Sequence, residues 1–434
     1  MQDNNTQNPP VLLVKALEVE DLSAKYDRRF TPLGNAERLI LRHGDRFRYL
    51  NETNEFIAWA DHRWYLDTGR IRMHRFCKDT IKSLCIGVRD KELRDAIEKW
   101  ARKSENEPMF VQMMDLVRSD RNIVIHKEDT DRYPDLLCCP NGVVNLVTGE
   151  LMPNKPEYLL IKNTNTPFSP DARFEPWDQF LDQISGRNER IKHFLHLAAG
   201  YTLQGSPREE VFFLLHGPGA TGKSTFLEAL SGALGDYATA ANFATFLRKD
   251  RTSGSGPSED IARLAGARLV TASEVNDGQR FDEATLKSIT GGDGITARFL
   301  HQNSFTYRPQ LKLWFSVNHL PFMATDDPAI WRRLIRIPFE HKPKELQNNL
   351  KTLFAKEEAR AAILAWAVRG AVEWFKSGLV MPPEIEKANA HAKEEMDPIA
   401  VFLTDECMLV RCPGDFVSAN SACWIGVGPA ERLG

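Results

Sequence analysis

The chain has 434 residues, of which 42% are hydrophobic and 26% are charged, and its formal net charge is −3. These values are typical of a globular protein with two or three domains, and they exclude a uniformly basic coat for nucleic acid, although not a local basic groove. The opening residues lack the pattern of a signal peptide, and no apolar run approaches the ~20 residues that span a bilayer. We therefore expect a cytoplasmic protein with no membrane partner.

The first part of the chain predicts a disordered lead-in over residues 1–23 and a mixed α+β accessory domain over 24–170. In that domain we expect a helix over 34–43, strands over 47–50, 56–59 and 63–66, and a helical stretch over 73–102. Asn141-Gly142 predicts the turn of a hairpin over 139–146, and three prolines between residues 163 and 176 indicate a linker.

Residues 177–345 alternate helical stretches with short apolar strands, which are expected over 211–215, 269–272 and 311–317. This alternation predicts an α/β domain with a parallel, doubly wound sheet. Residues 346–434 are expected to be a helical C-terminal region, with the strongest helical pattern over 357–376.

A glycine-rich loop between an apolar strand and a helix is the strongest chemical signal in the chain. It satisfies the pattern G-x-x-x-x-G-K-[ST] and contains Gly217, Pro218, Gly219, Ala220, Thr221, Gly222, Lys223, Ser224 and Thr225. In such a loop the backbone N–H groups and the helix N-terminus surround phosphates, the lysine reaches the β- and γ-phosphates, and the serine hydroxyl is a ligand of Mg²⁺. The sequence therefore predicts that ATP and Mg²⁺ bind here.

Polar residues that follow the other two strands are candidates for the remaining catalytic groups. Glu274 follows the strand over 269–272 and is the expected acid for Mg²⁺ and for the attacking water, unless it is only a solvated carboxylate at a strand end. Asn318 follows the third strand, where it would either orient the water or cap the next turn. Arg332 and Arg333 would either stabilise the transition state of a neighbouring subunit or form a surface salt bridge.

The order of these motifs resembles the superfamily 3 helicases, which are AAA+ ATPases, and most closely the phage/plasmid and poxvirus primase-helicase family. The resemblance rests on the glycine-rich loop, Ala-Ser-Glu274, the stretch from Leu286-Lys287 through Thr290-Gly291-Gly292-Asp293 to Arg298, Phe315-Ser316-Val317-Asn318, and Trp331-Arg332-Arg333. It extends upstream to Leu33-Gly34-Asn35, Trp59, Arg63-Trp64 and Asn141-Gly142-Val143, so that it covers about residues 30 to 405.

The resemblance implies an AAA+ motor that moves on single-stranded DNA as a homo-hexameric ring. It implies that Asn318 is the sensor, that Lys287 acts near the nucleotide or the interface, and that Arg332 or Arg333 is the finger. A hairpin between Arg298 and Tyr307 would contact DNA through Arg298, His301 and Gln302, although this tip lacks the lysine that the family often has there. The family's primase domain is expected to be absent, which makes a separate primase a candidate partner.

The last residues depart from the family pattern, because a winged-helix-like region would be expected after about residue 403. This departure indicates a truncated or frameshifted end. Three functions stay open on the sequence: a replicative DNA helicase of a phage, plasmid or integrated element, an ATP-driven initiator or remodeller, and an inactive prophage remnant that only binds DNA or a partner.

Overall fold

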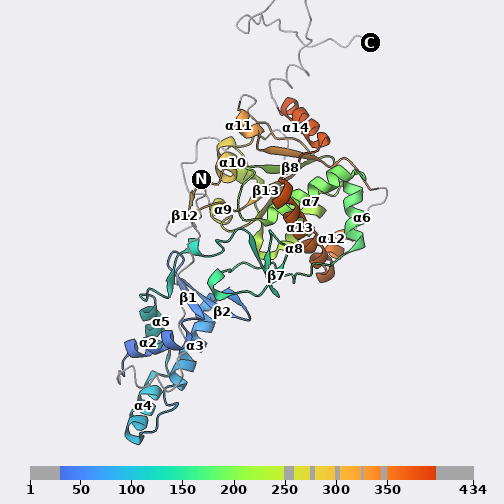
Figure 1. Cartoon of the computed structure of the whole chain (residues 1–434). Helices are drawn as coiled ribbons and strands as arrows, with labels where there is room; N and C mark the ends of the chain where they lie inside the picture. The colour runs from blue at the N-terminus through green and yellow to red at the C-terminus, as the bar shows by residue number, and fades with distance from the viewer. Residues whose placement is uncertain are drawn as a thin grey trace, which may run out of the picture.

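The computed structural model describes residues 30–248, 259–273, 279–298, 304–323, 327–343 and 349–396 (Figure 1). In Figure 1 the N-terminal α+β part lies at one end of the molecule, and helix α14 (Pro383–Glu395) lies at the other end. The larger α/β part lies between them and contains a parallel sheet. The α/β class and the preceding α+β part are therefore as predicted.

The α+β part is built on a four-stranded sheet in the order β3-β2-β1-β4. Its strands are β1 (Phe47–Leu50), β2 (Glu55–Ala60), β3 (Arg63–Leu66) and β4 (Val124–Ile125). Its helices are α2 (Pro32–His43), α3 (Ile71–Lys82), α4 (Lys91–Ser104) and α5 (Glu107–Val117). Phe47, Phe56, Met73 and Met113 are buried in one core between this sheet and helices α2, α3 and α5. The predicted helical stretch over 73–102 is thus two helices.

A small antiparallel sheet joins the two parts and consists of β5 (Leu136–Cys139), β6 (Gly142–Asn145) and β7 (Leu151–Met152). The predicted hairpin is confirmed, but the residues between the paired strands are Pro140 and Asn141, because Cys139 pairs with Gly142. Gly142 belongs to the strand, and a Cβ atom there would lie 2.5 Å from the carbonyl oxygen of Met152. The glycine therefore permits the close approach of β7 rather than making the turn.

The α/β part contains five parallel strands in the order β14-β8-β13-β10-β9. They are β8 (Phe212–His216), β9 (Ala238–Ala240), β10 (Leu269–Ser273), β13 (Lys312–Val317) and β14 (Leu334–Pro338). Side chains alternate between the two faces, as strand geometry requires. Phe213 and Leu215 enter one hydrophobic core, whereas Phe212 and Leu214 enter another. Both faces of the sheet are covered, which explains why its strands are continuously apolar.

Helices cover both faces of this sheet. One core includes residues of α6 (Glu175–Ile184), α7 (Glu189–Leu203), α8 (Lys223–Leu234), α12 (Leu350–Phe354) and α13 (Glu357–Ser377). The other includes residues of α9 (Glu259–Ala262), α10 (Glu283–Thr290) and α11 (Pro328–Trp331). Leu137, Val144 and Phe168 also lie in the first core, so this stretch of the expected accessory domain packs with the α/β part.

Two strands of the sheet were not predicted. Strand β9 has three residues, which is too short for a periodicity signal. Strand β14 has the sequence Leu-Ile-Arg-Ile-Pro, in which the charged residue Arg336 interrupts the apolar pattern although its side chain is buried. The predicted helices over 177–203 and 357–376 are confirmed as α6, α7 and α13.

The buried side chain of Arg268 links the small sheet to the amino ends of the central strands through hydrogen bonds. Its guanidinium donates to the carbonyl oxygens of Leu203 at 2.6 Å, Leu136 at 2.7 Å and Tyr133 at 3.3 Å, and it lies over the ring of Tyr237. These contacts join the segment before β5, the end of α7 and the start of β10.

We expect Arg268→Ala to lower the free energy of unfolding by about 3 kcal/mol, because it leaves buried carbonyl groups without donors. Urea denaturation followed by tryptophan fluorescence would measure this effect. Arg94→Ala is the control, since the side chain of Arg94 is 57% exposed and forms a surface ion pair with Glu98 of its own helix. Equal midpoints for the Arg268 variant and the parent would contradict this account of the junction.

Candidate nucleotide site

The glycine-rich loop leaves the carboxyl end of β8 and enters α8 in a conformation that requires glycine at two positions. Gly217 has a φ of 155°, and a Cβ atom there would lie 2.0 Å from the carbonyl oxygen of Phe339. Gly222 has a φ of 95°, and its Cβ atom would lie 2.7 Å from the side chain of Ile184. Ala220 also has a positive φ, 64°, which is unusual for a residue with a side chain. Gly217 and Gly222 therefore allow the loop a backbone conformation that residues with a side chain could not adopt at these two positions.

Lys223, the first residue of α8, is buried at the centre of this loop. Its Nζ donates to the carbonyl oxygens of Gly217 at 2.5 Å and Pro218 at 2.8 Å, and to Oδ1 of Asn318 at 3.0 Å. The structure therefore brings two predicted site residues, Lys223 and Asn318, into direct contact across neighbouring strands. An ammonium group here lies within the turn that the family motif assigns to phosphates, which fits an anionic ligand.

Strand register places the end of β10 at the same edge of the sheet as the ends of β8 and β13. Val317 pairs with His216, so Asn318 and Gly217 both leave the sheet at the next position. Ser273 pairs with Ser316, and Glu274 is the residue that follows Ser273. Glu274 itself lies outside the described residues, so its role stays a prediction. Open α/β sheets hold their ligands at this carboxyl edge.

Ser224 lies beside the end of β10. Ser224, Ser231, Thr271 and Ser273 line one cavity of about 290 Å³ between α8, β9 and β10. The predicted hydroxyl ligand of Mg²⁺ and the strand that leads to Glu274 thus face a shared space. Hydroxyl and carboxylate oxygens are the ligands that Mg²⁺ prefers, so these residue types fit the metal.

We expect Asn318→Ala to lower kcat for ATP hydrolysis by about 10- to 100-fold, because the variant loses the side chain that orients Lys223 and, on our assignment, the attacking water. Nucleotide affinity should change by less than about threefold, since the loop carbonyl contacts of Lys223 remain. Steady-state hydrolysis combined with titration of a fluorescent ATP analogue would separate the two effects. A loss that is confined to affinity would assign Asn318 to binding alone.

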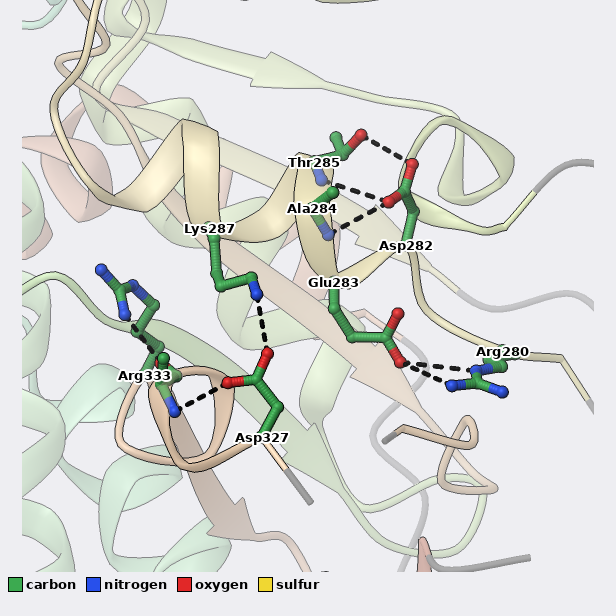
Figure 2. Close-up of polar contacts among 9 residues, drawn as sticks. Arg280, Asp282, Glu283, Ala284, Thr285, Lys287, Asp327 and Arg333 are labelled. Carbon is green, nitrogen blue, oxygen red and sulfur yellow. Dashed lines mark hydrogen bonds and ion pairs between the residues drawn. The ribbon is translucent and has the colours of Figure 1, made fainter. Parts of the chain in front are cut away.

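The predicted basic residues Lys287, Arg332 and Arg333 gather at another place in the fold, where Figure 2 shows Lys287 and Arg333. Lys287 of α10 donates to Oδ2 of Asp327 at 2.7 Å, a contact that lowers the pKa of this aspartate. Arg332 and Arg333 both donate to Oε2 of Glu210, at 3.0 and 2.7 Å. The side chain of Arg332 is 65% exposed and that of Arg333 only 9% exposed. The predicted alternative, a salt bridge, is therefore confirmed within one chain. Of the two arginines, Arg332 is the one whose side chain is exposed to solvent.

This basic cluster lies at the amino edge of the sheet, opposite the glycine-rich loop. Arg333 immediately precedes β14, whose first residue, Leu334, pairs with Phe212 at the start of β8. The glycine-rich loop begins after His216, four residues further along β8, which corresponds to about 13 Å at ~3.3 Å per residue. Neither Arg332 nor Arg333 is thus positioned to serve the loop of its own chain.

The predicted hairpin is present as β11 (Ile295–Ala297) and β12 (Phe305–Tyr307), which pair antiparallel. Arg298 follows β11 and is exposed. His301 and Gln302 lie outside the described residues, so their contact with DNA stays a prediction. The Lys127 ammonium lies 5.0 Å from the ring centre of Phe305, which places the α+β part against the base of this hairpin.

A network of polar and charged side chains beside the loop was not predicted from the sequence. His216, the last residue of β8, lies 2.8 Å from Arg336, and Arg336 also donates to Glu395 of α14 at 2.9 Å. Burial and the neighbouring arginine lower the pKa of His216 to about 4, so the imidazole is neutral at pH 7. An arginine inside the apolar strand Leu334–Pro338 was the available signal for this network.

Comparison with known proteins identifies relatives of both parts of the chain. Residues 36–186 match the family described as D5 N terminal like, and residues 215–333 match a family of unknown function, DUF5906. A putative helicase of Acanthamoeba polyphaga mimivirus, L207/L206, is 32% identical over 218 residues, which are 49% of this chain and 22% of that protein. Putative helicase 022R of Frog virus 3 is 33% identical over 249 residues, 53% of this chain and 25% of that protein. The chain is thus homologous to viral putative helicases, and its residues 36–186 resemble the D5 N terminal like family.

The uncoating factor OPG117 of Vaccinia virus is a more distant relative, at 21% identity over 313 residues that cover 67% of this chain and 36% of that protein. The chain spans about a quarter of the length of the mimivirus and frog virus proteins. Among solved structures, an apo NrS-1 C terminal region is 12% identical, with a TM-score of 0.48, and the match covers 86% of this chain and 78% of that one. Within the described ranges, no helix has the length and apolarity to cross a membrane.

Proposed function

We propose that this chain is an ATP-hydrolysing motor of the AAA+ type, within helicase superfamily 3, that translocates on single-stranded DNA as a ring. The observation that carries this proposal is the strand order β14-β8-β13-β10-β9 together with the groups at its carboxyl edge. The strand of Asn318 lies between the strand of the glycine-rich loop and the strand that leads to Glu274. A catalytic amide and a catalytic carboxylate can thus approach one bound phosphate chain from adjacent strands.

In this proposal each residue of the nucleotide site has a defined task. The backbone from Gly217 to Gly222 and the N-terminus of α8 bind the phosphates, and Lys223 neutralises charge on the terminal phosphate. Ser224 and Glu274 would hold Mg²⁺, which when bound supplies charge neutralisation at the phosphates. Asn318 would orient the attacking water, with its position fixed by the contact with Lys223.

A ring is proposed because the basic cluster cannot serve its own loop. Arg332 is exposed at the edge of the sheet that lies opposite the glycine-rich loop. A head-to-tail arrangement of identical chains would bring this edge of one subunit to the loop of the next, and such an arrangement closes into rings. We propose a hexamer on the family resemblance, with a separate primase as a candidate partner.

The decisive experiment combines hydrolysis with strand displacement. We expect the parent to displace a labelled strand from a forked duplex only with ATP and Mg²⁺. Glu274→Gln should bind ATP normally but lose hydrolysis by at least about 100-fold and lose displacement, since the water has no base. A variant that hydrolyses like the parent would remove Glu274 from the mechanism.

The same experiment separates the alternative functions. DNA-stimulated hydrolysis without displacement would indicate an initiator or remodeller. DNA binding without any hydrolysis would indicate an inactive remnant, an alternative that the intact contact between Lys223 and Asn318 disfavours.

A further inference from the structure

A basic and aromatic surface lies on the α+β part, away from the nucleotide site. Residues 63–82 contain six arginines and lysines but only two acids, although the chain as a whole has 56 basic and 59 acidic residues. The segment comprises the edge strand β3 and helix α3, which lies along the flank of this part next to β2 (Figure 1). The segment therefore has four more basic than acidic residues.

At the centre of this surface two arginines meet one tyrosine. The guanidinium carbons of Arg63 and Arg72 lie 4.1 and 4.2 Å from the ring centre of Tyr65. Planar guanidinium groups that are held against an aromatic ring form the kind of surface on which unpaired bases stack.

The turn between β3 and α3 holds this group in place. The carboxylate of Asp67 accepts hydrogen bonds from the backbone N–H groups of Arg72 and Met73, both at 2.8 Å. Asp67 is buried by these contacts, and within the described residues it forms no ion pair with the arginines. The acid that lies between Tyr65 and Arg72 in the sequence thus fixes the backbone of Arg72 instead of neutralising its side chain.

The exposed face of α3 extends the positive surface. Arg75, Lys78 and Lys82 are exposed, and Asp79 is the acid among them. Among the described residues, none of these three cations forms a salt bridge, and the same holds for Arg63 and Arg72. Exposed cations without acidic partners are available to the phosphates of a nucleic acid backbone.

We propose that Arg63, Tyr65, Arg72 and the exposed cations of α3 form a second binding surface for single-stranded DNA, outside the motor. The inference deepens the proposed function, because it assigns the α+β part to the same substrate as the motor. It depends on a different observation, however, and requires neither ATP nor the hairpin that contains Arg298. Single strands are the expected class because stacking on the guanidinium planes of Arg63 and Arg72, which lie over the Tyr65 ring, needs unpaired bases.

The test is a binding titration of the full chain, without nucleotide, on a fluorescent oligothymidylate of about 20 nucleotides, a length that spans several stacking sites. We expect Arg63→Gln/Arg72→Gln to weaken binding about tenfold at ~0.1 M salt. The slope of log K against log salt should fall by about 1.4, because each lost phosphate contact contributes ~0.7 for single strands. Lys91→Gln/Lys99→Gln on α4 is the matched control, since it removes two exposed charges elsewhere on the same part and should leave binding unchanged.

A second variant separates stacking from charge. Arg63→Lys/Arg72→Lys should keep the salt slope but lose affinity about threefold, because an ammonium group cannot stack as a planar guanidinium does. The proposal is overturned if the Gln variant binds as the parent does, if the α4 control loses as much affinity, or if the parent prefers a duplex of equal length and the Gln variant loses that preference.

The failure of this proposal can be distinguished from the failure of the motor assignment. The Gln variant should retain DNA-independent ATP hydrolysis, and Lys223→Ala should retain its binding to oligothymidylate. Normal hydrolysis with unchanged DNA binding in the Gln variant would overturn the second surface alone. A chain without hydrolysis that still loses DNA binding in the Gln variant would overturn the motor alone.

Discussion

Lys223→Ala is expected to lower Mg²⁺-dependent ATP hydrolysis by at least about 1,000-fold. The Lys223 ammonium lies within the turn of the loop and contacts both loop carbonyls and Asn318. Alanine removes the only cation of the loop itself and leaves the terminal phosphate without its counter-charge. The measurement is steady-state phosphate release at saturating ATP, with and without EDTA.

Two control variants make this result specific. Lys356→Ala removes an exposed lysine at the start of α13 and should hydrolyse ATP at the parental rate. Lys223→Arg keeps the charge, but its rate of ATP hydrolysis should remain at least about 100-fold below that of the parent. A planar guanidinium group cannot replace a compact ammonium group in this buried position. Undiminished turnover in Lys223→Ala would exclude the glycine-rich loop as the site of hydrolysis.

The local chemistry of the loop could be predicted from the sequence because strand, loop and helix are contiguous. Gly217, Gly222 and Lys223 act within one turn, and their conformations follow from short-range steric effects. The parallel sheet was likewise predictable, since strands that are buried on both faces read as apolar runs. A hairpin was expected over 139–146 and is found over 136–145. Its turn was misplaced, because the packing of β7 against Gly142 is a contact between separate strands.

Other features depend on contacts between distant segments and were not accessible to sequence reasoning. The hydrogen bond between Lys223 and Asn318 joins residues 95 positions apart, and strand register decides it. The polar edge of the sheet also accommodates Arg336, whose partners His216 and Glu395 come from β8 and α14. The sequence could not distinguish Arg332 from Arg333 either, because adjacent residues differ in exposure only after α11 and β14 are in place.

This difference in exposure leads to a prediction about assembly. Arg332→Ala should lower ATP hydrolysis by about 1,000-fold or more while leaving the fold intact, as expected for a finger that acts in trans. Its contact with Glu210 is solvent-exposed and contributes at most ~1 kcal/mol, so little stability is lost when the arginine turns to a neighbouring subunit. Arg333→Ala should instead destabilise the chain by about 2 kcal/mol, because its side chain is buried and also donates to the carbonyl oxygen of Ala329.

Mixing inactive variants tests whether the finger acts between subunits. Arg332→Ala retains a complete loop and Lys223→Ala retains the finger, so a mixed ring contains sites with both groups. In an equal mixture assembled at random, about a quarter of the interfaces are complete, and hydrolysis should recover to about that fraction of the parental rate. Lys223→Ala mixed with Lys223→Ala/Arg332→Ala is the control, since no interface then has an intact loop.

The concentration dependence of the parent gives an independent measure of the same interface. If each site needs an arginine from its neighbour, specific activity should rise with protein concentration until the ring is fully assembled, because the population of complete interfaces follows mass action. Arg332→Ala should assemble over the same concentration range in sedimentation velocity yet show no rise in activity. Specific activity that is constant with dilution through the monomeric range, together with no recovery in the mixture, would show that each chain hydrolyses ATP alone. Arg332 would then be a surface partner of Glu210 and nothing more, and the hydrolytic site would have to be completed by groups from the same chain.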